Sequence, residues 1–195
     1  MRVPATERRQ QLIDAAVRLT SRDGIEAANL RAIAQEANAP LSAVHYCFRD
    51  KDELMHEAVE FWLQQLVGMA EQAAIDGGLR GTLTTFADQF WHELEGDPRN
   101  ILAQLEVVTW AIRGESHEDL AVSIYSRYEA ALSKLFADAL VSAGETSAIP
   151  PGTLARAVVG IVDAGSLQYL SDPRSGQARI VYDLLIDALL VAAGL

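Results

Sequence analysis

The side chains that most often perform catalysis or bind metals are few and scattered in this sequence. Its four histidines are His45, His56, His92 and His117. Glu53 and His56 have the Glu-x-x-His spacing of half a di-iron site, but such a site needs a second copy and two further glutamates. The sequence also lacks a Gly-rich phosphate loop and a nucleophile elbow. We therefore expect no catalytic residue, no metal site and no cofactor, and we interpret Glu53 and His56 as residues on a helix surface.

A second group of residues has the types and spacing that contact nucleic acid. Two short helices are predicted over 29–36 and 41–47, with a tight turn at residues 38–40 between them. This is the helix-turn-helix pattern, in which the N-terminal residues of the second helix meet base edges in the major groove. Four residues would face outward on that helix: Ser42, Ala43, His45 and Tyr46.

The outward residues suit close approach to a duplex. Small side chains at Ser42 and Ala43 let the helix backbone come near, and Ala43 can touch a thymine methyl group. The phenol of Tyr46 can donate a hydrogen bond to a phosphate oxygen. Lys51, at the start of the next helix, would add positive charge, while Val44 and Phe48 point back into the core.

The formal net charge of −11 is unevenly distributed. Residues 1–51 contain eight Lys and Arg against six Asp and Glu, whereas residues 52–195 contain eight against twenty-one. Only the N-terminal segment has to approach DNA, so an acidic remainder does not prevent phosphate binding.

The elements that must position these residues are helices. Half of the residues are apolar and recur at helical spacing, so we predict an all-α protein. Thr6 and Asn29 are the expected N-caps of the first two helices, and Asp23-Gly24 is the expected end of the first. The predicted helices cover about residues 6–22, 29–36, 41–47, 51–75, 79–95, 98–113, 117–144, 151–171 and 175–193.

The cysteine count and the length of the apolar stretches indicate the cellular compartment. The single Cys47 excludes an internal disulfide, fits a reducing compartment, and is expected to be a small buried hydrophobe. No apolar stretch is long enough to span a bilayer, and the first residues show no signal-peptide pattern. We expect a cytoplasmic protein with no membrane partner.

Several spaced segments together resemble the N-terminal domain of the TetR family of regulators, without a gap over about residues 8–58. They are residues 12–16, Gly24, residues 30–34, and the run Ala43-Val44-His45-Tyr46-Cys47-Phe48-Arg49-Asp50-Lys51-Asp52-Glu53-Leu54. The resemblance implies an N-terminal three-helix DNA-binding domain, residues 1–51. It also implies a six-helix domain, residues 52–195, that binds a small-molecule effector and dimerises.

The resemblance also implies roles for single residues. Arg31 matches an arginine that contacts bases or phosphates, Ser42 and Ala43 match base-facing positions, and Lys51 matches a phosphate-binding lysine. His45 stands where the family usually has Tyr, with Tyr46 next to it, so either of the two is a candidate anchor on DNA. Asn38 replaces a common Gly in the turn, and Asn tolerates the left-handed conformation better than most residues.

The family's ligand cavity lies among its fourth to eighth helices. We accordingly expect an apolar pocket with Glu106 or Asp163 as its polar contact. Its apolar lining would come from Leu66, Phe86, Phe90, Trp110, Tyr125 and Tyr128. The alternative is that these aromatic stripes are ordinary core.

The last two predicted helices carry apolar residues around much of their circumference, so part of this apolar surface must be covered. A second copy of the chain is the simplest cover. This resembles the family's four-helix dimer interface. A twofold dimer would place two recognition helices about 34–36 Å apart on a near-palindromic operator. The implied function is a DNA-binding transcriptional regulator, a repressor released by a small, largely apolar ligand. A helical interaction module without DNA binding is the competing interpretation.

Overall fold

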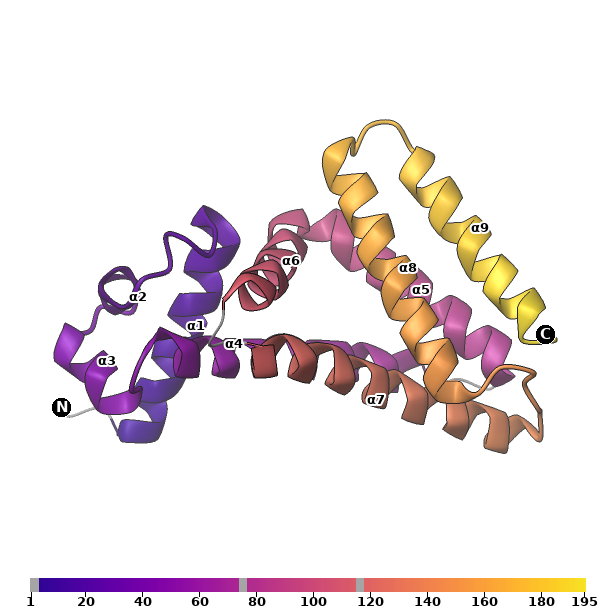
Figure 1. The fold of residues 1–195 in the computed structure, drawn as a ribbon, viewed down its shortest axis with the longest axis horizontal. Helices are drawn as coiled ribbons and strands as arrows, with labels where there is room; N and C mark the ends of the chain where they lie inside the picture. Colours follow the sequence, from indigo (N-terminus) through magenta and orange to yellow (C-terminus); the bar gives the residue numbers. More distant parts are fainter. Residues whose placement is uncertain (1–3, 74–76, 115–117) are drawn as a thin grey trace. The chain divides into compact units, whose positions relative to one another are not determined.

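A computed structural model describes residues 4–73, 77–114 and 118–195, without the side chains of residues 66, 70–73 and 118. Every regular element in these ranges is an α-helix, which confirms the predicted fold class (Figure 1). None of the described helices is long and apolar enough to cross a membrane. The helices are α1 Ala5–Asp23, α2 Leu30–Glu36, α3 Leu41–Cys47, α4 Lys51–Ala73, α5 Gly78–Gly96, α6 Pro98–Arg113, α7 Glu118–Ala143, α8 Pro151–Ser171 and α9 Gln177–Ala192.

Local signals explain most helix ends. The Asn29 side chain accepts a hydrogen bond from Ala32 N at 3.0 Å, as expected of an N-cap. Gly24, with φ of 86°, ends α1, and Asn38 adopts the left-handed conformation with φ of 49° in the turn before α3. The prediction for Thr6 was wrong. Helix α1 begins at Ala5, and its N-cap position is Pro4, which has no N–H group to leave unpaired and makes no side-chain cap hydrogen bond.

The chain divides into two compact units that differ from the predicted domain ranges. Unit 1 contains residues 1–62 and 99–122, and unit 2 contains residues 63–98 and 123–195. Helix α6 thus packs in the same unit as α1–α3. The predicted boundary at residue 51 separates the segment expected to bind DNA from the rest of the chain, and it stays a prediction.

Unit 1 is built on the apolar faces that the helical spacing predicts. The apolar residues at helical spacing in α1 are buried, and so are Ile33 and Ala34 of α2. Those of α1 are Leu12, Ile13, Ala16, Val17 and Leu19. Helix α4 contributes Trp62, which is 2% exposed and donates from Nε1 to Asn100 Oδ1 of α6 at 2.8 Å. Ser21 of α1 hydrogen-bonds to the same oxygen at 3.4 Å. One amide therefore connects three helices of the unit.

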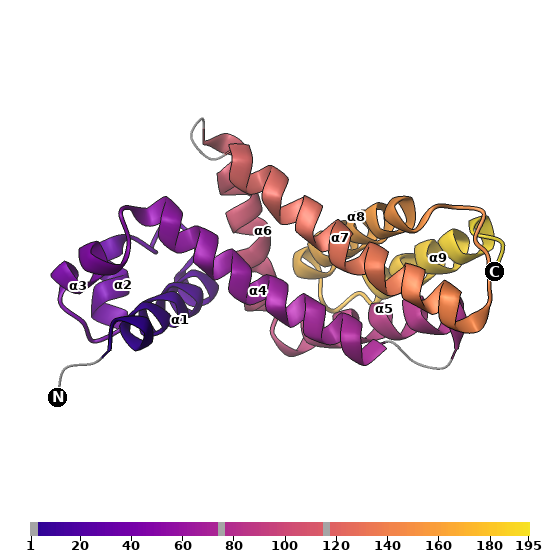
Figure 2. The same ribbon diagram turned by 90° about the horizontal axis from the view of Figure 1, so that it is seen from below.

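In unit 2, α8 and α9 pack side by side (Figures 1 and 2). Gly165 makes their close approach possible, because a Cβ at this position would lie 2.7 Å from Cδ2 of Tyr182. Tyr182 is 1% exposed and its ring lies 5.0 Å from that of Trp91 on α5. Phe86 and Phe90 of α5 are also buried.

Candidate nucleic-acid interface and ligand site

Helix α3 presents the residues predicted to face DNA. Ser42, His45 and Tyr46 are exposed, Tyr46 at 77%, and Ala43 is half-buried. On the opposite face Val44 and Phe48 are fully buried, as predicted. The helix therefore carries a short polar and aromatic surface on a fixed apolar base.

Arg9 of α1 anchors the end of this helix. Its guanidinium donates to the carbonyl oxygen of Cys47, the last residue of α3, and lies 4.2 Å from the centre of the Phe48 ring. It also donates to Glu53 Oε1 at 3.1 Å and Glu57 Oε1 at 3.2 Å on α4. One side chain thus satisfies an end carbonyl of α3 and fixes α3 against α1 and α4.

A capping arrangement starts α4 directly after α3. Asp50 Oδ1 accepts from Glu53 N at 2.9 Å, and Glu53 Oε2 accepts from Arg49 N at 3.0 Å and Arg49 Nε at 3.1 Å. The hydrogen bonds from Arg49 N and Arg49 Nε, with that from Arg9, lower the pKa of Glu53 to about 2. Glu53 is therefore a structural carboxylate. His56 is likewise engaged, since its Nδ1 lies 2.9 Å from Asp52 O.

Arg31 differs from most arginines around it. Arg18, Arg22 and Arg49 each form an ion pair with a carboxylate of unit 1. Arg31 lies exposed on α2 and has no hydrogen bond or ion pair with any described residue. Its guanidinium is available for a phosphate or a base edge, which supports the predicted role without testing it.

Lys51 is placed differently from the expectation. Its Nζ donates to Ile25 O at 2.8 Å and lies 5.5 Å from the centre of the Trp110 ring. Desolvation by these surroundings lowers the pKa of Lys51. In this structure the ammonium group is used to bind the loop between α1 and α2, and a phosphate contact by Lys51 stays a prediction.

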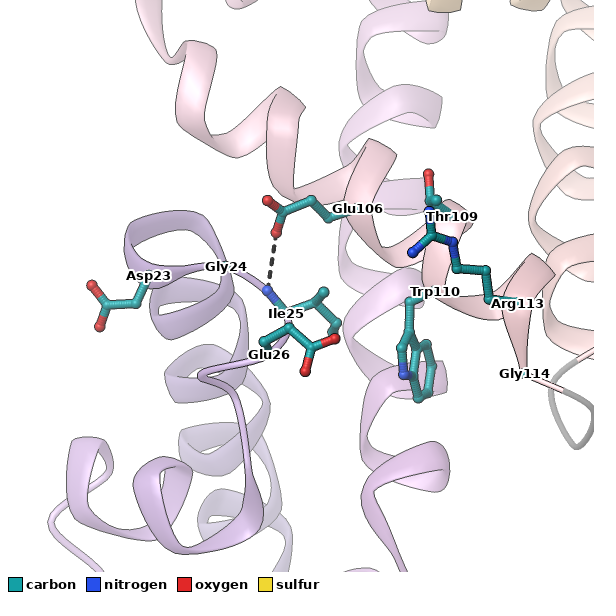
Figure 3. A pocket seen from close by; sticks show the side chains of 9 residues that line it. All are labelled: Asp23, Gly24, Ile25, Glu26, Glu106, Thr109, Trp110, Arg113 and Gly114. Carbon is teal, nitrogen blue, oxygen red and sulfur yellow. Dashed lines mark hydrogen bonds between the residues drawn. The ribbon is translucent and has the colours of Figure 1, made fainter.

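A pocket of about 600 Å³ lies between that loop and α6, within unit 1 (Figure 3). Glu106 Oε2 accepts from Ile25 N at 3.0 Å, and the Trp110 indole forms part of the wall. Nine residues line the pocket: Asp23, Gly24, Ile25, Glu26, Glu106, Thr109, Trp110, Arg113 and Gly114. Glu106 therefore serves as an acceptor for the backbone of the loop between α1 and α2.

The other predicted ligand residues belong to unit 2. Tyr125 of α7 donates from its hydroxyl to Asp163 Oδ2 of α8 at 2.7 Å. Burial raises the pKa of Tyr128, as does the charge of Asp163. Leu66 lies on α4, and its side chain falls outside the described residues. The structure thus brings Tyr125, Tyr128 and Asp163 together and places Glu106 and Trp110 in the other unit. The predicted ligand-binding residues therefore form two separate groups, and their role in binding a ligand stays a prediction.

Sequence reasoning missed Arg9 and Asn100. Both act through tertiary contacts, to α3 and α4 for Arg9 and to α1 and α4 for Asn100. A faint signal existed for Arg9, because Glu53 and Glu57 are four residues apart and so present two carboxylates on one face of a helix.

The comparisons with known proteins agree with this architecture. The sequence profile of the bacterial regulatory proteins of the tetR family matches residues 12–58. The chain is 45% identical over 197 residues to the HTH-type nicotine-responsive transcriptional repressor HdnoR of Paenarthrobacter nicotinovorans, which covers all of both proteins.

Solved structures share the fold. A TetR-family regulator from Rhodococcus sp. superposes with a TM-score of 0.80 at 18% identity, over 96% of this chain and 99% of that one. The multidrug binding protein EbrR, solved with ethidium, has a TM-score of 0.68 at 26% identity, over 92% of this chain and 98% of its own. With a full-length relative at 45% identity, this chain belongs to the TetR family and is a DNA-binding transcriptional repressor.

Proposed function

We propose that the protein is a cytoplasmic homodimer that represses genes at a near-palindromic operator, and that a small, largely apolar organic base of the nicotine kind releases it from DNA. The full-length similarity to the nicotine-responsive repressor HdnoR carries this proposal. The ethidium complex of EbrR adds that a more distant relative binds a flat organic ligand.

DNA binding is assigned to α2 and α3. The exposed side chains of Ser42, His45 and Tyr46 would meet base edges and phosphates, with Ala43 close to the groove floor. Arg31, which has no partner among the described residues, would supply an unpaired positive charge. Arg9 would keep α3 in place while it docks, because it binds the end of that helix.

Dimerisation is assigned to α8 and α9. Together they leave large apolar side chains in contact with solvent in the single chain: Leu167, Ile180, Leu184, Leu185 and Val191, between 39% and 70% exposed. Several large exposed apolar side chains on two neighbouring helices favour an interface with another protein surface. A second copy covers it with the same surface through a twofold axis, and the same axis pairs two recognition helices with two half-sites.

Release requires coupling between the units, and α4 runs from Lys51 in unit 1 to Ala73 in unit 2. A ligand that favours the conformation of α4 found in the DNA-free state would weaken operator binding. A coupling free energy of about 1–3 kcal/mol corresponds to about 5- to 150-fold in affinity.

The test is a selection of bound fragments from random DNA, followed by measurement of operator affinity with and without nicotine. We expect one dominant near-palindromic site, a salt-dependent affinity, and a 5- to 150-fold loss when nicotine is added. Sedimentation equilibrium at micromolar concentration should give a dimer. Equal binding to all duplexes without salt dependence, or a monomer, would contradict the proposal.

A further inference from the structure

Asp163 is a carboxylate in the interior of unit 2. It lies on α8, partly buried, and its Oδ2 accepts the 2.7 Å hydrogen bond from the Tyr125 hydroxyl. Tyr128, one turn further along α7, is close enough for the Asp163 charge to raise the pKa of its hydroxyl. Burial raises the pKa of Asp163, and the hydrogen bond from Tyr125 opposes that shift only in part.

Among the described residues, no cation compensates the charge of this carboxylate. In the part of the chain that the structure describes, no lysine, arginine or histidine forms an ion pair with Asp163. Two basic residues of the same helices are engaged elsewhere. Arg156 of α8 pairs with Glu129 at 3.3 Å, and Lys134 of α7 pairs with Asp138 at 2.6 Å. Removing a carboxylate from water without a partner costs free energy, so a positively charged group bound beside Asp163 would be stabilised.

A second polar group of unit 2 lacks a donor among the described residues. Helix α5 packs against α8, and the Oε1 atom of Gln89 on α5 is buried without a hydrogen-bond partner among the described residues. Gln89 follows Phe86 by one helical turn, and Phe86 is fully buried. Buried polar groups in native proteins are normally hydrogen-bonded, so an unpaired acceptor calls for a donor. A purely apolar ligand brings no donor for either group, and an anionic ligand would be repelled by the carboxylate of Asp163.

We propose that Asp163, oriented by Tyr125, binds the protonated nitrogen of the effector, and that the effector is therefore a small organic ammonium ion. This inference rests on the proposed ligand-controlled repression and deepens it. The carboxylate supplies the charge, and Tyr125 and Tyr128 of α7 offer aromatic surface beside it for the apolar part of the ligand. Tyr125 is a positioning residue, because its hydroxyl acts on the carboxylate.

The experiment uses pairs of ligands that differ in charge. Nicotine, whose pyrrolidine nitrogen is protonated at neutral pH, is compared with cotinine, its uncharged lactam, and further cyclic amines are compared with their lactams. Calorimetric titration of the full-length wild-type protein should show at least about 30-fold tighter binding of an amine than of its lactam. Asp163→Asn should remove that preference, whereas Asp138→Asn, an equivalent change at an exposed position of α7, should keep it.

Two further measurements separate this role from a structural one. The amide of Asp163→Asn still accepts from Tyr125 and carries no buried charge, so the ligand-free variant should melt at the same temperature as wild type or higher, and should still bind operator DNA. A lower melting temperature with an unchanged preference for amines would assign Asp163 to the core and overturn the proposal.

The proposal also fails if the variant binds amines as tightly as wild type, or if no amine in the panel binds wild type. A wild-type protein that binds its operator and is released only by uncharged compounds refutes this inference alone. A wild-type protein that binds no operator refutes the proposed function as well.

Discussion

Replacing Glu106 with alanine removes the acceptor that Glu106 provides for the loop between α1 and α2. Ile25 N donates to this carboxylate at 3.0 Å, and Ile25 is only 6% exposed. An N–H group left buried without an acceptor costs about 1–3 kcal/mol. We therefore expect Glu106→Ala to lower the free energy of unfolding by about 2 kcal/mol, which is a fall in melting temperature of about 4–8 °C for a chain of this size.

Glu106→Gln should have less than half of that effect, because it keeps an acceptor oxygen and loses only the charge, and charge-assisted hydrogen bonds are about twice as strong as neutral ones. Urea unfolding followed by circular dichroism, at one fixed protein concentration because dimerisation adds to stability, measures both variants. Glu93→Ala is the matched control, since Glu93 is exposed and should stay within about 0.5 kcal/mol of wild type. If Glu106→Ala is as stable as the Glu93 control, the assigned role of Glu106 is wrong.

Three other predictions concern unit 1 and the packing of α8. If Lys51 reaches a phosphate in the complex, Lys51→Met should reduce the slope of log K against log salt by about 0.9 per subunit, whereas a purely internal lysine would leave that slope unchanged. Because the pKa of Glu53 is lower in the folded than in the unfolded state, its carboxylate stabilises the fold above pH 4.5. The free energy of unfolding of wild type should therefore exceed that of Glu53→Gln by an amount that declines as the pH falls from 4.5 towards 2, as measured by unfolding at a series of acid pH values. A difference that is constant with pH would contradict this. Gly165→Ala should cost about 1–3 kcal/mol in thermal melts, because the new methyl group meets Tyr182. In the single chain Gly160→Ala meets nothing within 4 Å, and should not lose stability unless the partner subunit contacts this position.

The sequence predicted the helices well, because their signals are local. Asn29 and Gly24 act on atoms within four residues of themselves, and the buried positions of α3 follow from helical period alone. The error at Thr6 arose because a threonine and a preceding proline are both acceptable helix starts, and the backbone conformation of Pro4 decided between them.

The candidate site was predicted less completely, because periodicity shows which side chains share a face and does not show what packs against that face. Glu106 and Trp110 do lie on one face of α6, as their spacing requires. That face meets the loop of unit 1, and the predicted partners Tyr125 and Asp163 lie in unit 2. The use of Lys51 as a donor to Ile25 also depends on a contact between residues 26 positions apart, for which the sequence holds no local signal.

The outward surface of α3 contains no lysine or arginine, and several arginines around it are neutralised by carboxylates of their own unit. Attraction to arbitrary genomic sequence depends on the release of counterions from phosphates, which needs unpaired cations. We expect the protein to dwell only briefly on random DNA and to search the chromosome by repeated dissociation more than by sliding. Fewer molecules are then sequestered on competing sites, so a small number of copies per cell suffices to keep an operator occupied.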